Sequence, residues 1–224
     1  MISVREAAEV LGVSQKTVYR WINDGRLASH RLGGQYFLEK SEVNNLAIRE
    51  GLRPVPDAGQ EAEGDEDIPL HEMLTRGGVF YRISGKTKKE VLQHAIGMVK
   101  GVDESVSAPL FQMFLAREEL ASTGIGEHIA IPHARGSLLG YVSQPILSLS
   151  FLDTPIDYGA LDGKPVYALF LLISPNVRSH LRILAKLSFC LHDPACKEAI
   201  LSQASRETIL DVFAEAEARL RQGS

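Results

Sequence analysis

The stretch 121–135, ASTGIGEHIAIPHAR, decides the fold of the larger part of this chain. It begins with a turn that holds two glycines, continues with the apolar run IAI (129–131), and ends with Pro132 directly before His133. The apolar run predicts a short buried strand. Because proline cannot donate a hydrogen bond to a sheet ladder, the strand should stop there and place His133 on a sheet edge.

Two other side chains in the sequence could form a site together with His133. Arg117 lies just upstream, and His180 lies far downstream in SHLRILAKL (179–187). A neutral imidazole offers one nucleophilic nitrogen while a hydrogen bond holds the other. Two histidines and an arginine without an acidic partner favour a phosphoryl group over a metal ion or an acyl group. Gly124 and Gly126 would let backbone amides approach a phosphate, although such a pair is also typical of a plain turn.

Composition is that of a globular protein, and the length of 224 residues fits one large or two modest domains. No apolar run approaches the roughly 20 residues that span a bilayer, and residues 1–10 lack the apolar part of a signal peptide. The two cysteines, Cys190 and Cys196, are too few for a disulfide framework and match no zinc spacing. We therefore expect a cytoplasmic protein without membrane insertion, metal or other cofactor.

Charge divides the chain into three parts. Residues 1–50 carry seven Lys/Arg and six Asp/Glu, a net charge of +1, whereas residues 51–67 carry one arginine and six acids, a net charge of −5. The acidic stretch also holds two prolines and three glycines, so it cannot bury a core. The sequence thus predicts one domain over 1–50, an acidic flexible linker over 51–67 and a second domain over 68–224.

The first domain has the pattern of two short helices joined at Gly12. Ser3 and Glu6 form a capping box for the first helix, and Ser14 should cap the second, residues 15–23. Two apolar residues of this second helix, Val18 and Ile22, should face inward, which leaves hydrogen-bond donors on its outer face: Gln15, Lys16, Thr17, Tyr19 and Arg20. This arrangement predicts a helix-turn-helix whose second helix enters the major groove.

Residues 27–38 predict two short strands about a two-residue turn of Gly33 and Gly34, and Ser41 should cap a third helix. Together with AAEVLGVSQKTVYRWINDGRL (7–27), this winged pattern resembles the excisionase/MerR-like family of DNA-binding domains. The resemblance implies that the outer face of the second helix contacts double-stranded DNA. It also implies backbone or minor-groove contacts from the wing residues His30, Arg31 and Gln35. Because a net charge of +1 is low for such a domain, a small protein-interaction module stays open as an alternative.

The second domain interleaves predicted strands and helices. Apolar runs at 146–152 and 166–173 predict buried strands. Helical spacing predicts helices at 86–99 and 105–119, a helix with leucines at 181, 184, 187 and 191, and two more between residues 194 and 220. This order predicts an α/β fold, a three-layer sandwich around a mixed sheet.

Three motifs over residues 68–224 resemble the type-2, fructose/mannitol-type enzyme IIA of the bacterial phosphotransferase system, most closely its nitrogen-regulatory branch. They are REELASTGIGEHIAIPHAR (117–135), PIDYGALDGKPV (155–166) and SHLRILAKLSFCL (179–191). The resemblance implies that His133 accepts a phosphoryl group from an HPr-like phosphocarrier protein. His180 and Arg117 would hold the phosphoryl oxygens. Such a domain is a histidine phosphocarrier rather than a self-sufficient enzyme of multiple turnover.

Two functions from different classes are compatible with these patterns. The first is a transcriptional regulator whose DNA binding responds to phosphorylation of His133. The second is a phosphocarrier of a sugar-transport or nitrogen-type signalling relay, which passes phosphate to an enzyme IIB or a regulatory target protein and uses residues 1–50 for docking. The complete set of Arg117, His133 and His180 argues against a regulator that only binds partners. Helix-turn-helix proteins usually bind paired half-sites as dimers, which keeps a homodimer open. We favour the regulator.

Overall fold

A computed structural model of the full chain gives the structure of residues 2–32, 34–39, 42, 43, 46, 47, 68–102, 104–134, 138, 142 and 144–222. The chain divides into two compact units. The first comprises residues 1–65 with 136–143, and the second comprises residues 66–135 and 144–224. The linker predicted at 51–67 and the cap predicted at Ser41 lie outside the described residues. Among the described helices, none has the length and apolar character that a membrane crossing requires.

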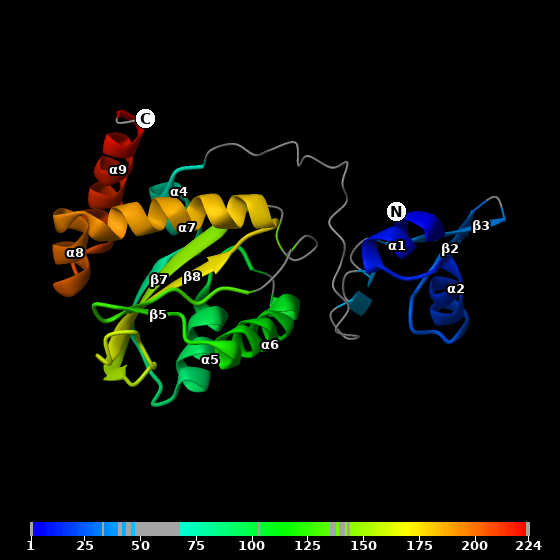
Figure 1. The fold of residues 1–224 in the computed structure, drawn as a ribbon, viewed down its shortest axis with the longest axis horizontal. Coiled ribbons are helices and arrows are strands. Elements are labelled where there is room, and N and C mark those ends of the chain that lie inside the picture. The colour runs from blue at the N-terminus through cyan, green and yellow to red at the C-terminus, as the bar shows by residue number, and fades with distance from the viewer. Residues whose placement is uncertain are drawn as a thin grey trace. The chain divides into compact units, whose positions relative to one another are not determined.

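The first unit is a helix-turn-helix followed by a β-hairpin (Figure 1). Its elements are β1 (Ile2–Ser3), α1 (Val4–Leu11), α2 (Gln15–Asn23), β2 (His30–Leu32) and β3 (Gln35–Leu38). Leu32 pairs with Gln35, so the predicted two-residue hairpin turn is confirmed. The strand at Ile2 was not predicted; it pairs with the far edge of β3 and makes a three-stranded sheet in the order β1-β3-β2.

The helix caps predicted at Ser3 and Ser14 are present. The carboxylate of Glu6 accepts a hydrogen bond from the backbone N–H of Ser3 at 2.7 Å, and the Ser3 hydroxyl accepts one from the N–H of Glu6 at 3.3 Å. Ser14 caps α2 through the N–H of Thr17. One core prediction was incomplete, because Trp21 is buried beside Val18 whereas Ile22 is only half-buried. Trp21 belongs to the same buried hydrophobic cluster as Val18 and Leu11.

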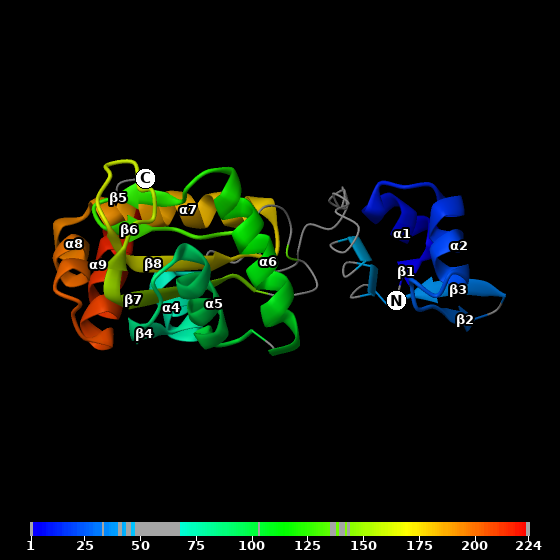
Figure 2. The ribbon, with the colours of Figure 1, turned by 90° about the horizontal axis from the view of Figure 1, so that it is seen from below.

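The second unit is a three-layer α/β sandwich, as predicted (Figures 1 and 2). Its helices are α4 (Leu70–Gly77), α5 (Lys88–Met98), α6 (Glu104–Leu120), α7 (Val177–His192), α8 (Pro194–Leu201) and α9 (Arg206–Gln222). Its strands are β4 (Val79–Ile83), β5 (Gly124–Gly126), β6 (Ile129–Ala130), β7 (Ile146–Ile156) and β8 (Val166–Ile173).

The five strands form one mixed sheet in the order β4-β7-β8-β6-β5. The pairs β4–β7 and β6–β8 are parallel, whereas β7–β8 and β5–β6 are antiparallel. Helices α4, α7, α8 and α9 cover one face, and α5 with α6 covers the other (Figure 1). Because β7 and β8 lie in the middle with helices on both faces, they read as continuous apolar runs in the sequence.

The two glycines predicted to form a turn lie instead in the edge strand β5. This strand pairs with β6, and the tight turn between them consists of Glu127 and His128, whose φ angles are 49° and 65°. Left-handed values in residues with side chains cost on the order of 1–3 kcal/mol each. Contacts from elsewhere in the unit must therefore hold this turn.

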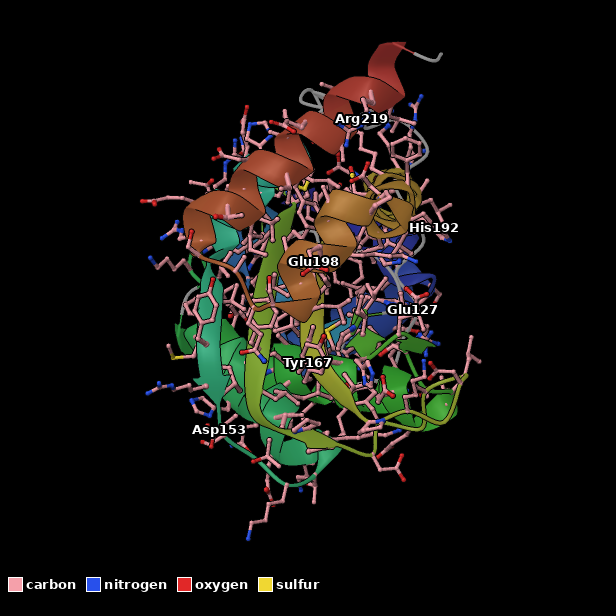
Figure 3. The ribbon with its side chains drawn as sticks, turned by 90° about the vertical axis from the view of Figure 1, so that its left-hand side faces the viewer. Glu127, Asp153, Tyr167, His192, Glu198 and Arg219 are labelled. Atoms are coloured by element: carbon pink, nitrogen blue, oxygen red, sulfur yellow. The ribbon has the colours of Figure 1, made fainter. Side chains whose placement is uncertain are left out.

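Those contacts come from the loop after β7, from β8 and from α8. The N–H of Glu127 donates to the carboxylate of Asp162 at 2.9 Å, and the carboxylate of Glu127 pairs with Lys197 at 2.9 Å. The imidazole of His128 stacks on the ring of Tyr167 at a centroid distance of 5.3 Å. Figure 3 shows Glu127 and Tyr167 on neighbouring parts of this side of the unit.

The buried face of α7 differs from the predicted leucine pattern. Leu181 is 61% exposed, whereas Ile183, Lys186 and Leu187 are buried. The Lys186 ammonium lies 3.1 Å from the carboxylate of Glu217 on α9. Sequence periodicity cannot predict a buried lysine, because its burial depends on a carboxylate that another helix supplies.

Substitution of Phe213 tests the packing of the sandwich core. The Phe213 side chain is fully buried at 0% exposure and lies against Phe170 of β8, with ring centroids 5.8 Å apart. We expect Phe213→Ala to lower the free energy of unfolding by about 3–5 kcal/mol, because the substitution leaves a cavity. The matched control is Phe189→Ala, since Phe189 is 41% exposed and should lose under about 1 kcal/mol. Urea denaturation of both variants measures the difference, and equal losses would contradict this packing.

Candidate functional site

The fold brings together the three side chains that the sequence singled out. Arg117 lies in the last turn of α6, His133 follows β6, and His180 lies in the first turn of α7. The Nε of Arg117 donates to the Nε2 of His133 at 3.2 Å, and the two imidazole centroids are 5.0 Å apart. All three side chains are half-buried, so each presents part of its surface to solvent.

Hydrogen bonds select one tautomer of His133. Its Nδ1 lies 2.8 Å from the carbonyl oxygen of Ile131, which can only accept, so Nδ1 carries the proton. In the neutral ring, Nε2 then has the lone pair, and this agrees with the donor that Arg117 directs at it. The nucleophilic nitrogen of His133 is therefore Nε2.

Pro132 places His133 at the end of two parallel strands. The N–H of Leu172 donates to the carbonyl of Pro132 at 3.0 Å, and His133 pairs with Leu172 as a single parallel bridge. The predicted break of the strand at the proline is confirmed. The sheet edge that carries His133 is the one at the carboxyl ends of β6 and β8, and β6 itself lies inside the sheet between β8 and β5.

His180 is placed by the start of α7. Asn176 caps this helix, its side chain accepting from the N–H of Ser179, and the Nδ1 of His180 lies 3.3 Å from the hydroxyl of Ser174. Burial is the main cause that lowers the pKa of His180 to about 4, and the nearby charges of His133 and Arg117 lower it further. The ring is thus neutral at pH 7 in a site that already holds the Arg117 cation.

The glycines assigned to a phosphate cradle make other contacts. The N–H of Gly124 donates to the Ser122 hydroxyl at 3.1 Å, and a Cβ on Gly124 would lie 2.8 Å from the Cα of Ala160. A Cβ on Gly126 would lie 3.2 Å from the Cγ of Asp162. These glycines therefore let β5 pack against the 157–164 loop, and their proposed contact with phosphate has no support in this geometry.

The predicted DNA-contacting residues lie along α2 and the hairpin of the first unit. Gln15, Lys16, Tyr19 and Arg20 are exposed, as are His30 and Arg31 of β2. Thr17 is half-buried, and its hydroxyl lies 2.9 Å from that of Ser14, so it serves the helix cap. The side chain of Gln35 lies outside the described residues.

A ring cluster that the sequence did not predict joins the helix face to the hairpin. Tyr19 meets Tyr36 of β3 edge-on at a centroid distance of 6.0 Å, and the Arg31 guanidinium lies 5.7 Å from the Tyr36 ring centroid. Tyr36 and Phe37 are both half-buried, so no alternation along this short strand could have predicted the direction of Tyr36. The cluster makes α2 and the hairpin one continuous surface.

Two further observations bear on the chemistry of the chain. Within the described ranges, no group of three or more His, Cys, Asp or Glu side chains lies together as metal ligands would. Both cysteines are buried and reduced, and burial raises the pKa of each thiol to about 12. Cys190 therefore has the role of a small hydrophobic residue, as predicted.

Comparison with known proteins identifies the family of the second unit. Residues 72–216 match the family described as "Phosphoenolpyruvate-dependent sugar phosphotransferase system, EIIA 2". The chain belongs to this family. Residues 1–49 match the family described as "Helix-turn-helix domain", so an EIIA domain and a helix-turn-helix domain stand on one chain.

Three relatives illustrate the similarity of the EIIA domain. The nitrogen regulatory protein of Pseudomonas aeruginosa is 33% identical over 151 residues, which cover 66% of this chain and 96% of that protein. The fructose-specific EIIA component of Haloferax volcanii is 38% identical over 103 residues, 45% of this chain and 65% of that protein. The crystal structure of the nitrogen regulatory protein IIA-Ntr from Neisseria meningitidis aligns with a TM-score of 0.55 at 26% identity, covering 64% of this chain and 98% of that one.

The lowered pKa of His180 makes stability depend on pH. The folded value of about 4 lies below the 6.5 of an unperturbed histidine, so the unfolded chain binds this proton more strongly. The contribution of neutral His180 to the free energy of unfolding is complete above pH 6.5 and is lost as the pH falls from 6.5 to 4. We expect this loss to be roughly 1–2 kcal/mol, because solvent screens a half-exposed ring.

Urea denaturation across this pH range measures the effect. His180→Gln should lose less stability than the native chain between pH 6.5 and 4, whereas the control His192→Gln, at an exposed position, should follow the native chain. Parallel curves for the native chain and His180→Gln would show that His180 is not the group that titrates.

Proposed function

We propose that this protein is a transcriptional regulator linked to the phosphotransferase system. In this proposal, His133 accepts a phosphoryl group from an HPr-like phosphocarrier protein, and the added charge modulates DNA binding by the first unit. The observation that carries the proposal is the contact of Arg117 Nε with the unprotonated Nε2 of His133, beside a second imidazole, on a chain that also holds a helix-turn-helix domain.

The transfer step follows from the tautomer. The lone pair on His133 Nε2 attacks the phosphorus of the donor's phosphohistidine and forms the new N–P bond. The old N–P bond breaks, and its electron pair returns to the donor imidazole. Because the charge in flight is spread over three oxygens, catalysis requires mainly positioning and positive charge. Arg117 supplies the cation, and His180 supplies a hydrogen-bonding ring at the start of a helix, where anions are stabilised.

Exposed apolar side chains around the site favour a protein as phosphoryl donor. Leu120 follows Arg117 at the end of α6, and Val177 and Leu181 flank His180 on α7; all three are exposed. Apolar residues gathered beside reactive groups are typical of a protein-binding surface. The same surface would serve a second protein that takes the phosphate onward, such as an enzyme IIB or a regulatory target.

For the first unit we propose an excisionase/MerR-like mode of DNA binding. The exposed face of α2, with Lys16 and Arg20, would enter the major groove, and Arg31 on the hairpin would reach the neighbouring phosphates. The Tyr19–Tyr36 contact fixes the helix relative to the hairpin, which suits simultaneous contact with a groove and its backbone. Binding as a homodimer to paired half-sites would compensate for the small net charge of this unit.

Coupling between the two sites would be electrostatic. A phosphoryl group adds about −1.5 to −2 charges at pH 7. Residues 51–67 carry a net charge of −5 and connect the two units in sequence. The phosphate would compete with these acids for the cations around Arg117 and Arg135, and so change how the units or two copies of the chain dock. Arg135 and the acidic stretch lie outside the described residues.

Labelling with phosphoenolpyruvate, enzyme I and HPr tests the acceptor. We expect one phosphoryl group, mapped by mass spectrometry to His133, and none on His133→Ala. His180→Ala should slow transfer by about 100-fold, the scale for removing one preorganised hydrogen-bond donor. The control His192→Ala, which removes an exposed histidine, should label at the native rate. Normal labelling of His133→Ala would overturn the assignment.

Titration of a duplex selected from random sequence tests DNA binding and its coupling to phosphate. We expect log affinity to fall with log salt at about 0.9 per phosphate contacted, and Lys16→Ala to reduce this slope by about 1. Lys100→Ala, an exposed lysine of the second unit, is the matched control. Phosphorylation at His133 should change affinity by roughly 5- to 150-fold, the usual range of coupling.

Deletion of residues 57–67 should reduce that change if the acidic stretch carries the coupling. Equal affinities of the phosphorylated and unphosphorylated chains would leave two independent domains and favour a phosphocarrier whose first unit serves docking. Absence of any retained duplex at low salt would exclude DNA binding.

A further inference from the structure

Glu118 is a buried carboxylate that the proposed transfer does not use. It follows Arg117 on α6, yet it is only 5% exposed, while its neighbour Glu119 is exposed. A buried carboxylate is unfavourable unless charges and hydrogen bonds satisfy it. Lys88 of α5 lies 3.4 Å from its Oε1, and Thr123 donates to the carboxylate from both its backbone N–H and its hydroxyl. Tyr158 is also close: burial, and after it the charge of Glu118, raise the pKa of its hydroxyl.

The contacts with Thr123 fix the turn between α6 and β5. The N–H of Thr123 lies 3.1 Å and 3.2 Å from the two carboxylate oxygens, and the Thr123 hydroxyl donates to Oε2. This turn contains Ala121, whose carbonyl accepts a hydrogen bond from the Arg117 guanidinium at 2.7 Å. The carboxylate of Glu118 thus fixes the turn whose backbone carbonyl binds the Arg117 guanidinium.

Thr123 also leads to the imidazole. Its carbonyl accepts from the N–H of Ile131 at 3.0 Å, and the carbonyl of Ile131 holds Nδ1 of His133 at 2.8 Å. Three successive hydrogen bonds therefore run from the Glu118 carboxylate to the ring of His133. One buried group is thus linked by hydrogen bonds to the backbone that contacts both the cation and the nucleophile, which meet at a 3.2 Å contact.

The geometry points to Glu118 as a positioning residue of the site. Through Thr123, it keeps the side chains of Arg117 and His133 in their relative positions. The inference rests on the proposed phosphoryl transfer to His133 and adds a residue to it. Glu118 does not touch the phosphoryl group; it acts through the turn at 121–123. Lys88 balances its charge from 3.4 Å and also lies 5.0 Å from the ring centroid of Tyr158.

The test compares Glu118→Gln with Glu119→Gln in the full chain. Glutamine keeps the shape and one acceptor oxygen but loses the charge and the paired acceptors. We expect the turnover of phosphoryl transfer from phosphorylated HPr to fall about 10- to 100-fold, the scale for small misplacement of reacting groups. The KM for phosphorylated HPr should change less than about two-fold, since the docking surface is intact. Glu119→Gln should behave as the native chain.

A second measurement separates this inference from the proposed function. Nitrogen-15 NMR of the His133 ring reports which nitrogen holds the proton, whether or not the chain accepts phosphate. In the native chain we expect the Nδ1–H form, and in Glu118→Gln a mixture of both tautomers. If the native chain takes no phosphate but Glu118→Gln still shifts the tautomer, the proposed function fails and the positioning role stands.

A third variant covers the case in which Glu118→Gln does not fold. Thr123→Val removes only the hydroxyl bond and keeps the backbone N–H, so we expect a two- to five-fold loss of turnover, about what one neutral hydrogen bond contributes. Native turnover and native imidazole signals in a folded Glu118→Gln, or in Thr123→Val if the first variant is unfolded, would overturn the inference. A raised KM with unchanged turnover would also overturn it, because Glu118 would then act in the binding of phosphorylated HPr.

Discussion

The hydrogen bond from His133 Nδ1–H to the carbonyl of Ile131 is the constraint on which the site depends. A carbonyl can only accept, so this bond keeps the proton on Nδ1 and leaves the lone pair on Nε2. Pro132 between the two residues has no N–H and a fixed φ, so the backbone turns out of the β5–β6 ladder while its carbonyl stays bonded to Leu172. The ring is thus oriented by main-chain geometry before any partner arrives.

A second histidine of the same motif shows that a held Nδ1 is not sufficient for chemistry. The Nδ1 of His128 also lies 2.7 Å from a backbone carbonyl, that of Pro165. However, its ring stacks on Tyr167, and it stands in a turn where both residues have positive φ. His133 differs because a guanidinium is directed at its Nε2 and a neutral imidazole faces it. The two histidines therefore divide into one that supports the hairpin and one suited to a phosphoryl group.

The electrostatics of the His133 site fit an incoming anion. Arg117 provides a permanent positive charge, and the lowered pKa of His180 shows that the site resists a second one. A phosphoryl group on Nε2 would reverse this balance, since its negative charge would stabilise both Arg117 and a protonated His180. Phosphorylation would therefore alter the charge of the surface formed by the start of α7 and the end of α6, where Leu120 and Leu181 are exposed. Such a change provides a physical basis for a switch.

Much of this protein was determined by the sequence alone. The caps at Ser3 and Ser14, the two-residue hairpin turn, the bounds of α2 and β8, and the break at Pro132 were all predicted, because each depends on residues within a few positions of one another. The tertiary structure alone decided that Gly124 lies in a strand, that Trp21 is buried, and that Leu181 is exposed. It also decided that Glu118 bonds to Thr123. These features depend on what another element places opposite the residue, such as Ala160 against Gly124, and no local pattern encodes the partner that distant parts of the chain supply.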